Sequence, residues 1–515
     1  MRVPALKRGE RCILHFDAVD YACACYVNGS RIGEHKGAYL PFSFDVTEYV
    51  QAEEAELEAQ LEIALCVYDP SDTGVQLRGK QRLEGGDIWY TAQSGIWQSV
   101  WLEFVPAKHV ETLEITATGE GFLSVMAKLS GLGEQLCVEL LDEMGEVLAS
   151  ETLDVPDDGE SCTTLRTAFM KIPDVRLWSP EDPYLYDLAI RYGDDVVRSY
   201  CGFRTLSMEK DERGVKRFCL NGKPVFLRGV LDQGYWPDGL LTAPSDEALV
   251  WDIQTMKDLG FNMLRKHIKI EPQRWYYHCD RLGMLVWQDM VTGGSPYEAW
   301  HTSYKPTLFK PSWHAYGDER PSHYAHLSAG DAAYREEWQQ SCLGVIDHLG
   351  NHPSVVTWVL FNEAWGQFEA RKMTKLVRSA DASRPVDSVS GWYDQSCGDF
   401  HSVHNYFRKL EVYRDHAKPE EVRDAFNCDG SRAFAISEFG GLAFLVPGHS
   451  LYDVAYGYAS FDTMGAWCEG VRDHLAQVDA LEAQGLAGYV YTQLSDVEEE
   501  VNGLVTYDRR IVKLA

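Results

Sequence analysis

Basic residues are too few to balance the acidic ones: 48 Lys and Arg stand against 78 Asp and Glu, a formal net charge of −30. Phosphate backbones and anionic membranes repel such a surface, so neither a nucleic-acid partner nor a membrane is predicted. The chain also lacks an apolar run of membrane-spanning length, and its start, "MRVPALKRGERCILHFDAVD", has no stretch of signal-peptide length. A cytoplasmic location is therefore predicted.

Paired cysteine motifs are missing as well, although the chain has 13 cysteines. They are scattered singly apart from Cys23 and Cys25, and the absence of a CxxC pair argues against a zinc ribbon or a thioredoxin-type motif. We expect buried free thiols, which fits a reducing compartment. Low-complexity linkers and internal repeats are absent too.

The pattern that is present divides the chain into three predicted domains. Residues 1–106 alternate apolar and polar residues, with the hairpin dipeptide Asn28-Gly29 between two runs, so they predict an all-β sandwich. Residues 107–206 continue with shorter strands at the spacing of an immunoglobulin-like sandwich. In residues 207–515, short apolar runs alternate with helix-length amphipathic stretches.

Eight apolar runs of the third domain predict strands that are buried on both faces of a parallel sheet. They are 225–232, 263–267, 284–290, 355–363, 386–392, 400–406, 433–440 and 488–494. Helical patterns lie between most of them, at 245–259, 272–282, 331–349 and 366–380. Eight such units predict a (β/α)₈ barrel. The alternative, an open doubly wound sheet, lacks a glycine-rich phosphate loop after its first strand.

Each of the eight runs ends in polar or aromatic residues, and in a barrel these ends meet at the active-site face. The candidates are Asp232, Arg265, Lys266, His267, Asp289, Asn362, Glu363, Trp392, His404, Asn405, Tyr406, Glu438, Tyr491 and Gln493, with Trp365 just beyond the fourth run. Any one of them alone could be a capping or loop residue. Their recurrence at every strand end predicts one common pocket.

Two carboxylates, Glu363 and Glu438, follow strongly apolar runs. Facing strand ends can bring two carboxyl groups to about 5–5.5 Å, the separation that retaining glycosidases use. One carboxyl then acts as acid and base, and the other attacks the anomeric carbon. Asn362 is placed to hydrogen-bond the sugar 2-hydroxyl, and Tyr406 to hold the nucleophile.

Other chemistries fit less well. The His323/His326 and His401/His404 pairs have i, i+3 spacing, which does not put both rings on one face of a strand, and neither matches a usual zinc signature. A Ser/His/Asp hydrolase lacks its GxSxG elbow. No metal and no cofactor are predicted.

The motifs along the chain resemble glycoside hydrolase family 2, which contains β-galactosidases, β-glucuronidases and β-mannosidases. "HFDAVDY" and "SGIWQSVWLE" are similar to its jelly-roll sugar-binding domain, and "LWSPEDPYLYDL" is similar to its immunoglobulin-like domain. "FCLNGKPVFLRGV", "DRLGMLVWQDM" and "HPSVVTWVLFNEAWGQF" are similar to the barrel entry, its third strand and the acid/base signature. Family members usually have several dozen residues before "HFDAVDY", so a truncated N-terminus is expected.

By this resemblance Glu363 is the acid/base, Glu438 the nucleophile, Tyr406 its tyrosine partner and Arg265 an active-site arginine. The family usually has His-Tyr-Pro after that arginine, whereas the sequence here is "RKHIKIEP". Asn502 stands where glucuronidases carry the lysine that grips the substrate carboxylate. This argues against an ordinary β-glucuronidase, although Lys266 could grip an acidic sugar instead.

The predicted function is a retaining exo-β-glycosidase, first of all a β-galactosidase-like one. The alternatives are a β-glycosidase for glucuronides, galacturonides, mannosides or arabinopyranosides, and a catalytically inactive carbohydrate-binding protein on the same scaffold. A carbohydrate is the expected partner, and a homo-oligomer is possible. The aromatic-rich segment between the third and fourth strands is expected to cap the pocket and to shape its specificity.

Overall fold

The computed structural model describes residues 1–50, 58–157, 162–424 and 426–514. It divides into two compact units. The first contains residues 1–69, 94–204 and 347–353, and the second contains residues 70–93, 205–346 and 354–515. Residues 70–93, which the sequence pattern assigns to the N-terminal sandwich, therefore belong to the second unit. The domain bounds 1–106, 107–206 and 207–515 remain predictions.

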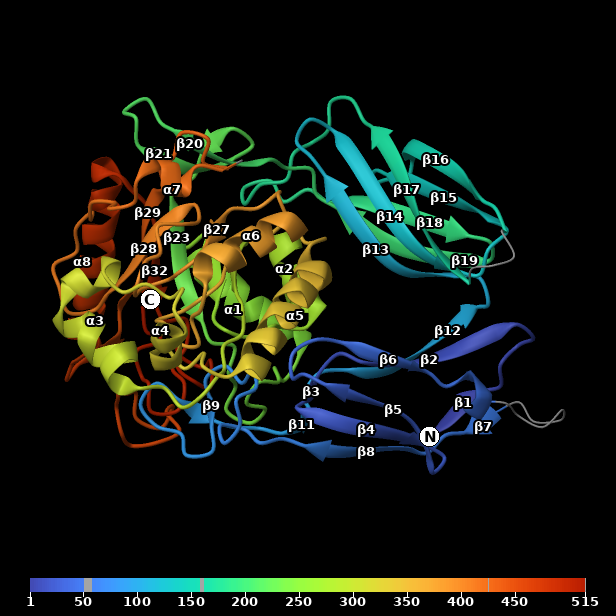
Figure 1. Cartoon of the computed structure of the whole chain (residues 1–515), viewed down its shortest axis with the longest axis horizontal. Helices are drawn as coiled ribbons and strands as arrows, with labels where there is room; N and C mark the ends of the chain where they lie inside the picture. Colours follow the sequence, from blue (N-terminus) through green and yellow to red (C-terminus); the bar gives the residue numbers. More distant parts are fainter. Residues whose placement is uncertain (51–57, 158–161, 425, 515) are drawn as a thin grey trace. The chain divides into compact units, whose positions relative to one another are not determined.

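The N-terminal part is a jelly-roll sandwich of short antiparallel strands (Figure 1, blue). Its two main sheets contain β2 (Glu10–Phe16), β4 (Ala22–Val27), β5 (Ser30–Lys36), β6 (Phe42–Asp45), β8 (Ile63–Tyr68) and β12 (Val100–Pro106). Asn28 and Gly29 both have positive φ, 48° and 80°, and turn β4 into β5 as the dipeptide predicts. Alternate residues of β2 and β4, such as Leu14 and Cys25, are buried between the sheets.

The next part of this unit is the immunoglobulin-like sandwich (Figure 1, cyan to green). One sheet contains β13 (His109–Ala117), β14 (Phe122–Ser130) and β17 (Thr163–Lys171). The other contains β15 (Glu134–Leu141), β16 (Val147–Val155), β18 (Tyr186–Tyr192) and β19 (Asp195–Cys201). Leu123, Val125, Leu136 and Val138 are completely buried between the sheets, because alternate residues of each strand face inward.

The second unit is built around a parallel sheet of eight strands in the order β27-β26-β25-β24-β23-β32-β29-β28. They are β23 (Leu227–Asp232), β24 (Met263–Lys266), β25 (Leu285–Asp289), β26 (Val355–Val359), β27 (Val386–Asp387), β28 (Phe400–Asn405), β29 (Ala433–Gly440) and β32 (Leu486–Thr492). Asp399 N, directly before β28, donates a hydrogen bond to Val386 O of β27 at 2.7 Å and so links the two end strands. The sheet thus curls into a nearly closed (β/α)₈ barrel, which confirms the predicted fold class.

The connections between the barrel strands carry the expected helices. The long ones are α1 (Asp246–Asp258), α2 (Gln273–Leu282), α5 (Ala332–Leu349), α6 (Ala370–Ala380) and α8 (Met464–Leu481). The segment between β25 and α5 contains short helices: η2 (Trp300–Tyr304), α3 (Lys305–Leu308), η3 (Lys310–His314) and α4 (Pro321–His326). Ser245 caps α1 by accepting a hydrogen bond from Ala248 N, and its hydroxyl satisfies an otherwise unpaired amide.

Two expectations about the whole chain can be compared with the structure. All 13 cysteines lie in the described part of the chain and are free, and most are buried, as predicted. Across residues 1–50, 58–157, 162–424 and 426–514, no helix is both long and apolar enough to cross a membrane.

Candidate active site

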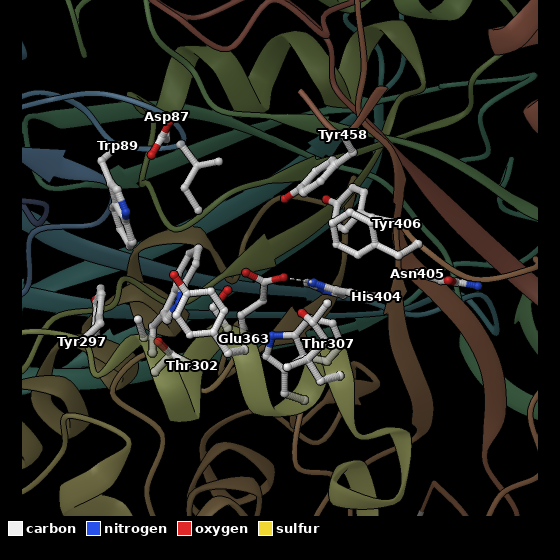
Figure 2. A pocket seen from close by; sticks show the side chains of 18 of the residues that line it. Asp87, Trp89, Tyr297, Thr302, Thr307, Glu363, His404, Asn405, Tyr406 and Tyr458 are labelled. Carbon is white, nitrogen blue, oxygen red and sulfur yellow. Dashed lines mark hydrogen bonds and ion pairs between the residues drawn. The ribbon is translucent and has the colours of Figure 1, made fainter. Parts of the chain in front are cut away.

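The barrel brings together the two predicted catalytic carboxylates, which are 75 residues apart in the sequence. Glu363 follows β26, and Glu438 lies in β29. One oxygen of each carboxylate and a ring nitrogen of His404 all lie within 4.8 Å of one another. In Figure 2 the Glu363 carboxylate points toward His404 across the floor of the pocket.

An unusual backbone conformation presents Glu363 to the pocket. Glu363 and Ala364 have φ values of +47° and +64°, a left-handed conformation that costs energy for residues with a Cβ. Glu363 N donates to Ser390 O at 2.9 Å, which anchors this turn. Gly366 also has a positive φ, and a Cβ there would lie 2.0 Å from Tyr334 Oη. The chain therefore turns sharply out of the barrel wall at this carboxylate.

Burial raises the pKa of Glu363 to about 7, and the nearby charge of Glu500 contributes in the same direction. The positive charges of Lys80 and Arg265 act against this increase. The side chain is 13% exposed, so its carboxyl group still reaches the cavity. A carboxyl with such a pKa is substantially protonated at neutral pH, as a general acid requires.

We expect the activity to decline as the pH rises through about 7, because the proton on Glu363 is lost there. The measurement is kcat/KM against pH, which reports groups of the free enzyme. An activity that stays constant from pH 6 to pH 9 would contradict this assignment. A substrate whose leaving group needs no protonation serves as the control, since its alkaline decline should be weaker.

Glu438 has two hydrogen-bonding partners and a histidine close by. Tyr406 Oη donates to its Oε2 at 2.5 Å, and Arg265 Nη1 donates to its Oε1 at 3.2 Å. His404 Nδ1 lies 3.3 Å from Oε2. Burial and the charge of Glu363 leave the pKa of Glu438 raised, although His404, Arg265 and the Tyr406 hydroxyl act in the opposite direction. These partners stabilise the ionised form, which a nucleophile needs.

His404 contacts both carboxylates through one nitrogen. Its Nδ1 lies 2.8 Å from Glu363 Oε1, and its Nε2 lies 2.9 Å from Ser390 Oγ. Burial lowers the pKa of His404 to about 4, so the ring is neutral and carries a single N–H. Since Nδ1 faces two carboxylate oxygens, we place the proton on Nδ1. Nε2 then accepts from Arg265 Nη1 at 3.5 Å, while the Ser390 hydroxyl donates to Ser437 Oγ at 2.8 Å.

Arg265 organises the floor of the site. It is completely buried, and its guanidinium donates to both oxygens of Asp289, at 2.9 and 3.1 Å. It also donates to Asn362 Oδ1 at 2.7 Å, which fixes the orientation of that amide. Asn362 Nδ2 is buried and has no hydrogen-bond partner among the described residues, so it is available to a ligand hydroxyl. His267 Nδ1 completes the network at 2.9 Å from Asp289 Oδ2.

Several residues predicted to bind substrate are engaged elsewhere. Lys266 Nζ is only 2.6 Å from Asp232 Oδ2 and 2.9 Å from Glu271 Oε1, and its side chain is 1% exposed. It is therefore not available to grip a substrate carboxylate, because its own carboxylate partners already neutralise it. Tyr491 is fully buried, and its ring packs where a Cβ of Gly440 would lie.

The cavity beside Glu363 has a volume of about 520 Å³, the size of a small-ligand pocket. Of the predicted residues, Trp365, Trp392, His404, Asn405 and Tyr406 line it together with Glu363. The segment between β25 and α5 contributes Tyr297, Ala299, Thr302, Ser303, Tyr304, Thr307, Leu308 and Trp313. The aromatic-rich segment therefore forms a wall of the pocket, and its role in specificity stays a prediction (Figure 2).

Sequence reasoning missed a second wall, made by residues 70–93. Arg82, Asp87 and Trp89 of this segment line the cavity, and the Trp89 ring lies 4.9 Å from that of Trp365. Figure 2 shows Trp89 and Asp87 across the pocket from Tyr406. No periodic signal marks this loop as part of a barrel site. Its Trp-Tyr pair, "DIWYT", is the one available hint.

Comparison with known families agrees with this architecture. The model of the glycosyl hydrolases family 2 TIM barrel domain matches residues 213–512. The family's sugar binding domain matches residues 2–106, and a further family 2 model matches residues 123–204. The chain belongs to glycosyl hydrolase family 2.

Its relatives within the family include β-galactosidases. The β-galactosidase large subunit of Leuconostoc lactis is 27% identical over 403 residues, which is 76% of this chain and 58% of the relative. The β-galactosidase of Streptococcus thermophilus is 26% identical over 433 residues, 81% of this chain and 37% of the relative. This chain thus spans less than two thirds of each relative.

Solved structures show the same fold. The β-D-glucuronidase of Dictyoglomus thermophilum superposes with a TM-score of 0.72 at 17% identity, covering 100% of this chain and 87% of that one. A β-galacturonidase from Eisenbergiella tayi bound to galacturonate gives a TM-score of 0.70 at 18% identity, with coverage of 100% and 87%.

Proposed function

We propose that this chain is a retaining exo-β-glycosidase that removes a terminal sugar by double displacement. The leading candidate substrate is a β-galactoside. The observation that carries the proposal is the close pairing of Glu363 and Glu438, whose nearest oxygens lie within 4.8 Å. Retaining glycosidases hold their carboxyl groups about 5–5.5 Å apart, whereas inverting enzymes need about 6.5–9.5 Å for a water molecule.

In the first step Glu438 attacks the anomeric carbon while Glu363 protonates the leaving oxygen. The C–O bond to the aglycone breaks, and an ester bond forms between Glu438 and the sugar. Tyr406 and Arg265 hold the attacking carboxylate in position. Asn362 Nδ2, which has no partner in the described part of the chain, would donate to the sugar 2-hydroxyl, and such a hydrogen bond strengthens as the oxocarbenium ion develops.

In the second step Glu363, now ionised, removes a proton from water. The water oxygen attacks the anomeric carbon and releases Glu438, so the product keeps the β configuration. The aromatic walls fit this substrate class: Trp89, Tyr297 and Trp365 form one group of rings with centroids 4.9–5.8 Å apart. Flat sugar faces pack well on such rings.

The proposal is tested with a panel of nitrophenyl β-glycosides: galactoside, glucuronide, galacturonide, mannoside and arabinopyranoside. We expect the highest kcat/KM on the galactoside, and NMR of the first product should show the β anomer. An α anomer as the first product would exclude the retaining mechanism. Binding without turnover on any sugar would support the inactive carbohydrate-binding alternative.

One observation favours an acidic sugar as the second candidate. Lys80 is buried, with its ammonium 5.8 Å from the Trp365 ring and 5.3 Å from the Tyr90 ring. It makes no ion pair with any residue in the described part of the chain. A substrate carboxylate would supply the missing counter-ion, a role that Lys266 cannot play because it is already paired.

If the substrate is a uronide, Lys80→Met should lower the ratio of kcat/KM on uronide to kcat/KM on galactoside by about 10- to 100-fold. This corresponds to a hydrogen bond with a charged group, about 1.5–3 kcal/mol. The ratio is the useful measure, because a change in the Glu363 pKa affects both sugars equally. Lys372→Met, at an exposed lysine of α6, is the matched control. An unchanged ratio would reject the acidic-sugar candidate.

A further inference from the structure

A buried histidine outside the pocket lacks the partners that its ring requires. His401 lies in β28, is 1% exposed, and neither of its ring nitrogens has a hydrogen-bond partner among the described residues. Strand residues three apart point to opposite faces, so His401 points away from the face on which His404 contacts Glu363. A buried polar atom without a hydrogen-bond partner destabilises the folded state by about 1–3 kcal/mol, so a ligand for this ring would offset a cost that the fold otherwise bears.

Two further ligand-type side chains lie beside it. His314, at the end of η3, has its ring centre 5.5 Å from that of His401, and its Nδ1 lies 3.7 Å from Asp394 Oδ2. His314 Nδ1 also lacks a hydrogen-bond partner in the described part of the chain. One ligand atom from each of His314, Asp394 and His401 falls within 4.8 Å of the others.

The surrounding charges leave room for a cation. Arg432 donates to both oxygens of Asp394, at 2.7 and 2.8 Å, and to both oxygens of Asp415, at 2.6 and 2.9 Å. Two carboxylates against one guanidinium give a formal charge of −1.

We propose that His314, Asp394 and His401 form a binding site for a divalent transition metal of the zinc type. Two imidazoles and a carboxylate with a water as fourth ligand are a common zinc donor set. Bonds of about 2.1 Å in a tetrahedron separate ligand atoms by about 3.4 Å, so no pair of these groups has to close by more than about 1.4 Å. The His314 side chain is 21% exposed and lies on a short helix, so it has room to move.

Such a metal would fasten a wall of the pocket to the barrel. Trp313, next to His314, lines the cavity and packs 5.7 Å from Trp392. His401 belongs to a barrel strand, whereas His314 belongs to the segment between β25 and α5. Bound zinc would therefore stabilise residues 300–314 without touching the substrate.

The test is a titration of the full chain with zinc chloride after dialysis against a chelator. We expect one equivalent to bind with a Kd of micromolar or lower, and binding should slow proteolysis within residues 300–314. His401→Phe and His314→Ala should each weaken the affinity at least 100-fold. The surface variant His323→Ala is the matched control and should bind like the wild type.

Glu363, His404 and Glu438 form a second group that could bind zinc, so the experiment must distinguish binding there from binding at the proposed site. Zinc bound at the proposed site should be retained in Glu363→Gln, which removes a ligand from that group. Loss in Glu363→Gln with retention in His401→Phe would overturn the proposal. So would absence of binding at 100 µM free zinc, which would leave an ordered water as the partner of His401. His314→Ala keeps the test valid if His401→Phe does not fold, as circular dichroism would show.

Discussion

Glu438→Gln should abolish turnover while leaving sugar binding intact. An amide cannot attack the anomeric carbon, so kcat should fall by at least about 10⁴-fold, as for other enzymes that lose their nucleophile. The replacement has the shape of the native side chain, and its oxygen can still accept from Tyr406 or Arg265. The measurements are kcat on the preferred nitrophenyl glycoside and sugar affinity by calorimetry.

Glu411→Gln, at a half-exposed glutamate that is not among the residues lining the pocket, is the matched control and should keep wild-type activity. Azide provides a second check with Glu438→Ala, where it can occupy the space of the carboxylate. It should restore some activity and give an α-glycosyl azide, since it attacks from the face of Glu438. Turnover in Glu438→Gln close to that of the wild type would remove this residue from the mechanism.

Glu363→Gln should cause a loss that depends on the leaving group. Alkyl and sugar leaving groups need a proton, so kcat/KM on these substrates should fall by about 10²–10⁴-fold. Dinitrophenolate leaves without protonation, so formation of the glycosyl-enzyme from a dinitrophenyl glycoside should be much less affected. The decline of activity above a pH of about 7 should disappear at the same time, because that pKa belongs to Glu363.

Leaving-group series for the wild type and Glu363→Gln provide the measurement. Azide should accelerate Glu363→Ala and give a β-glycosyl azide, the opposite anomer to that from Glu438→Ala. An equal loss on every leaving group would show that Glu363 holds the substrate and does not transfer a proton. The two anomers thus assign the two carboxylates independently.

The strand ends could be predicted from the sequence because the signal is local. An apolar run such as "VVTWVLF" has to be buried, and the polar residues that follow it have to lie at its end. Eight runs in sequence then predict a barrel, whose geometry places Glu363, His404 and Glu438 at the same edge. Their mutual distances and residue roles required the folded chain.

Pairing between side chains was not predictable in the same way. Asp232 and Lys266 end neighbouring strands, and nothing in either run indicates that they neutralise each other instead of facing the ligand. The wall formed by residues 70–93 could not be predicted for a different reason. Those residues stand between strands of the N-terminal sandwich in the sequence, and only tertiary packing places them with the barrel.

The single N–H of His404 has a consequence for the order of events in the proposed reaction. Its Nδ1 lies 2.8 Å from Glu363 and 3.3 Å from Glu438, so one proton donor is shared by two acceptors. In the resting state Glu438 is the anion, and after the ester forms Glu363 is. Negative charge therefore crosses from one side of the imidazole to the other in each half of the cycle. A small tilt of the ring lets the same donor follow that charge, and no proton has to enter or leave the histidine.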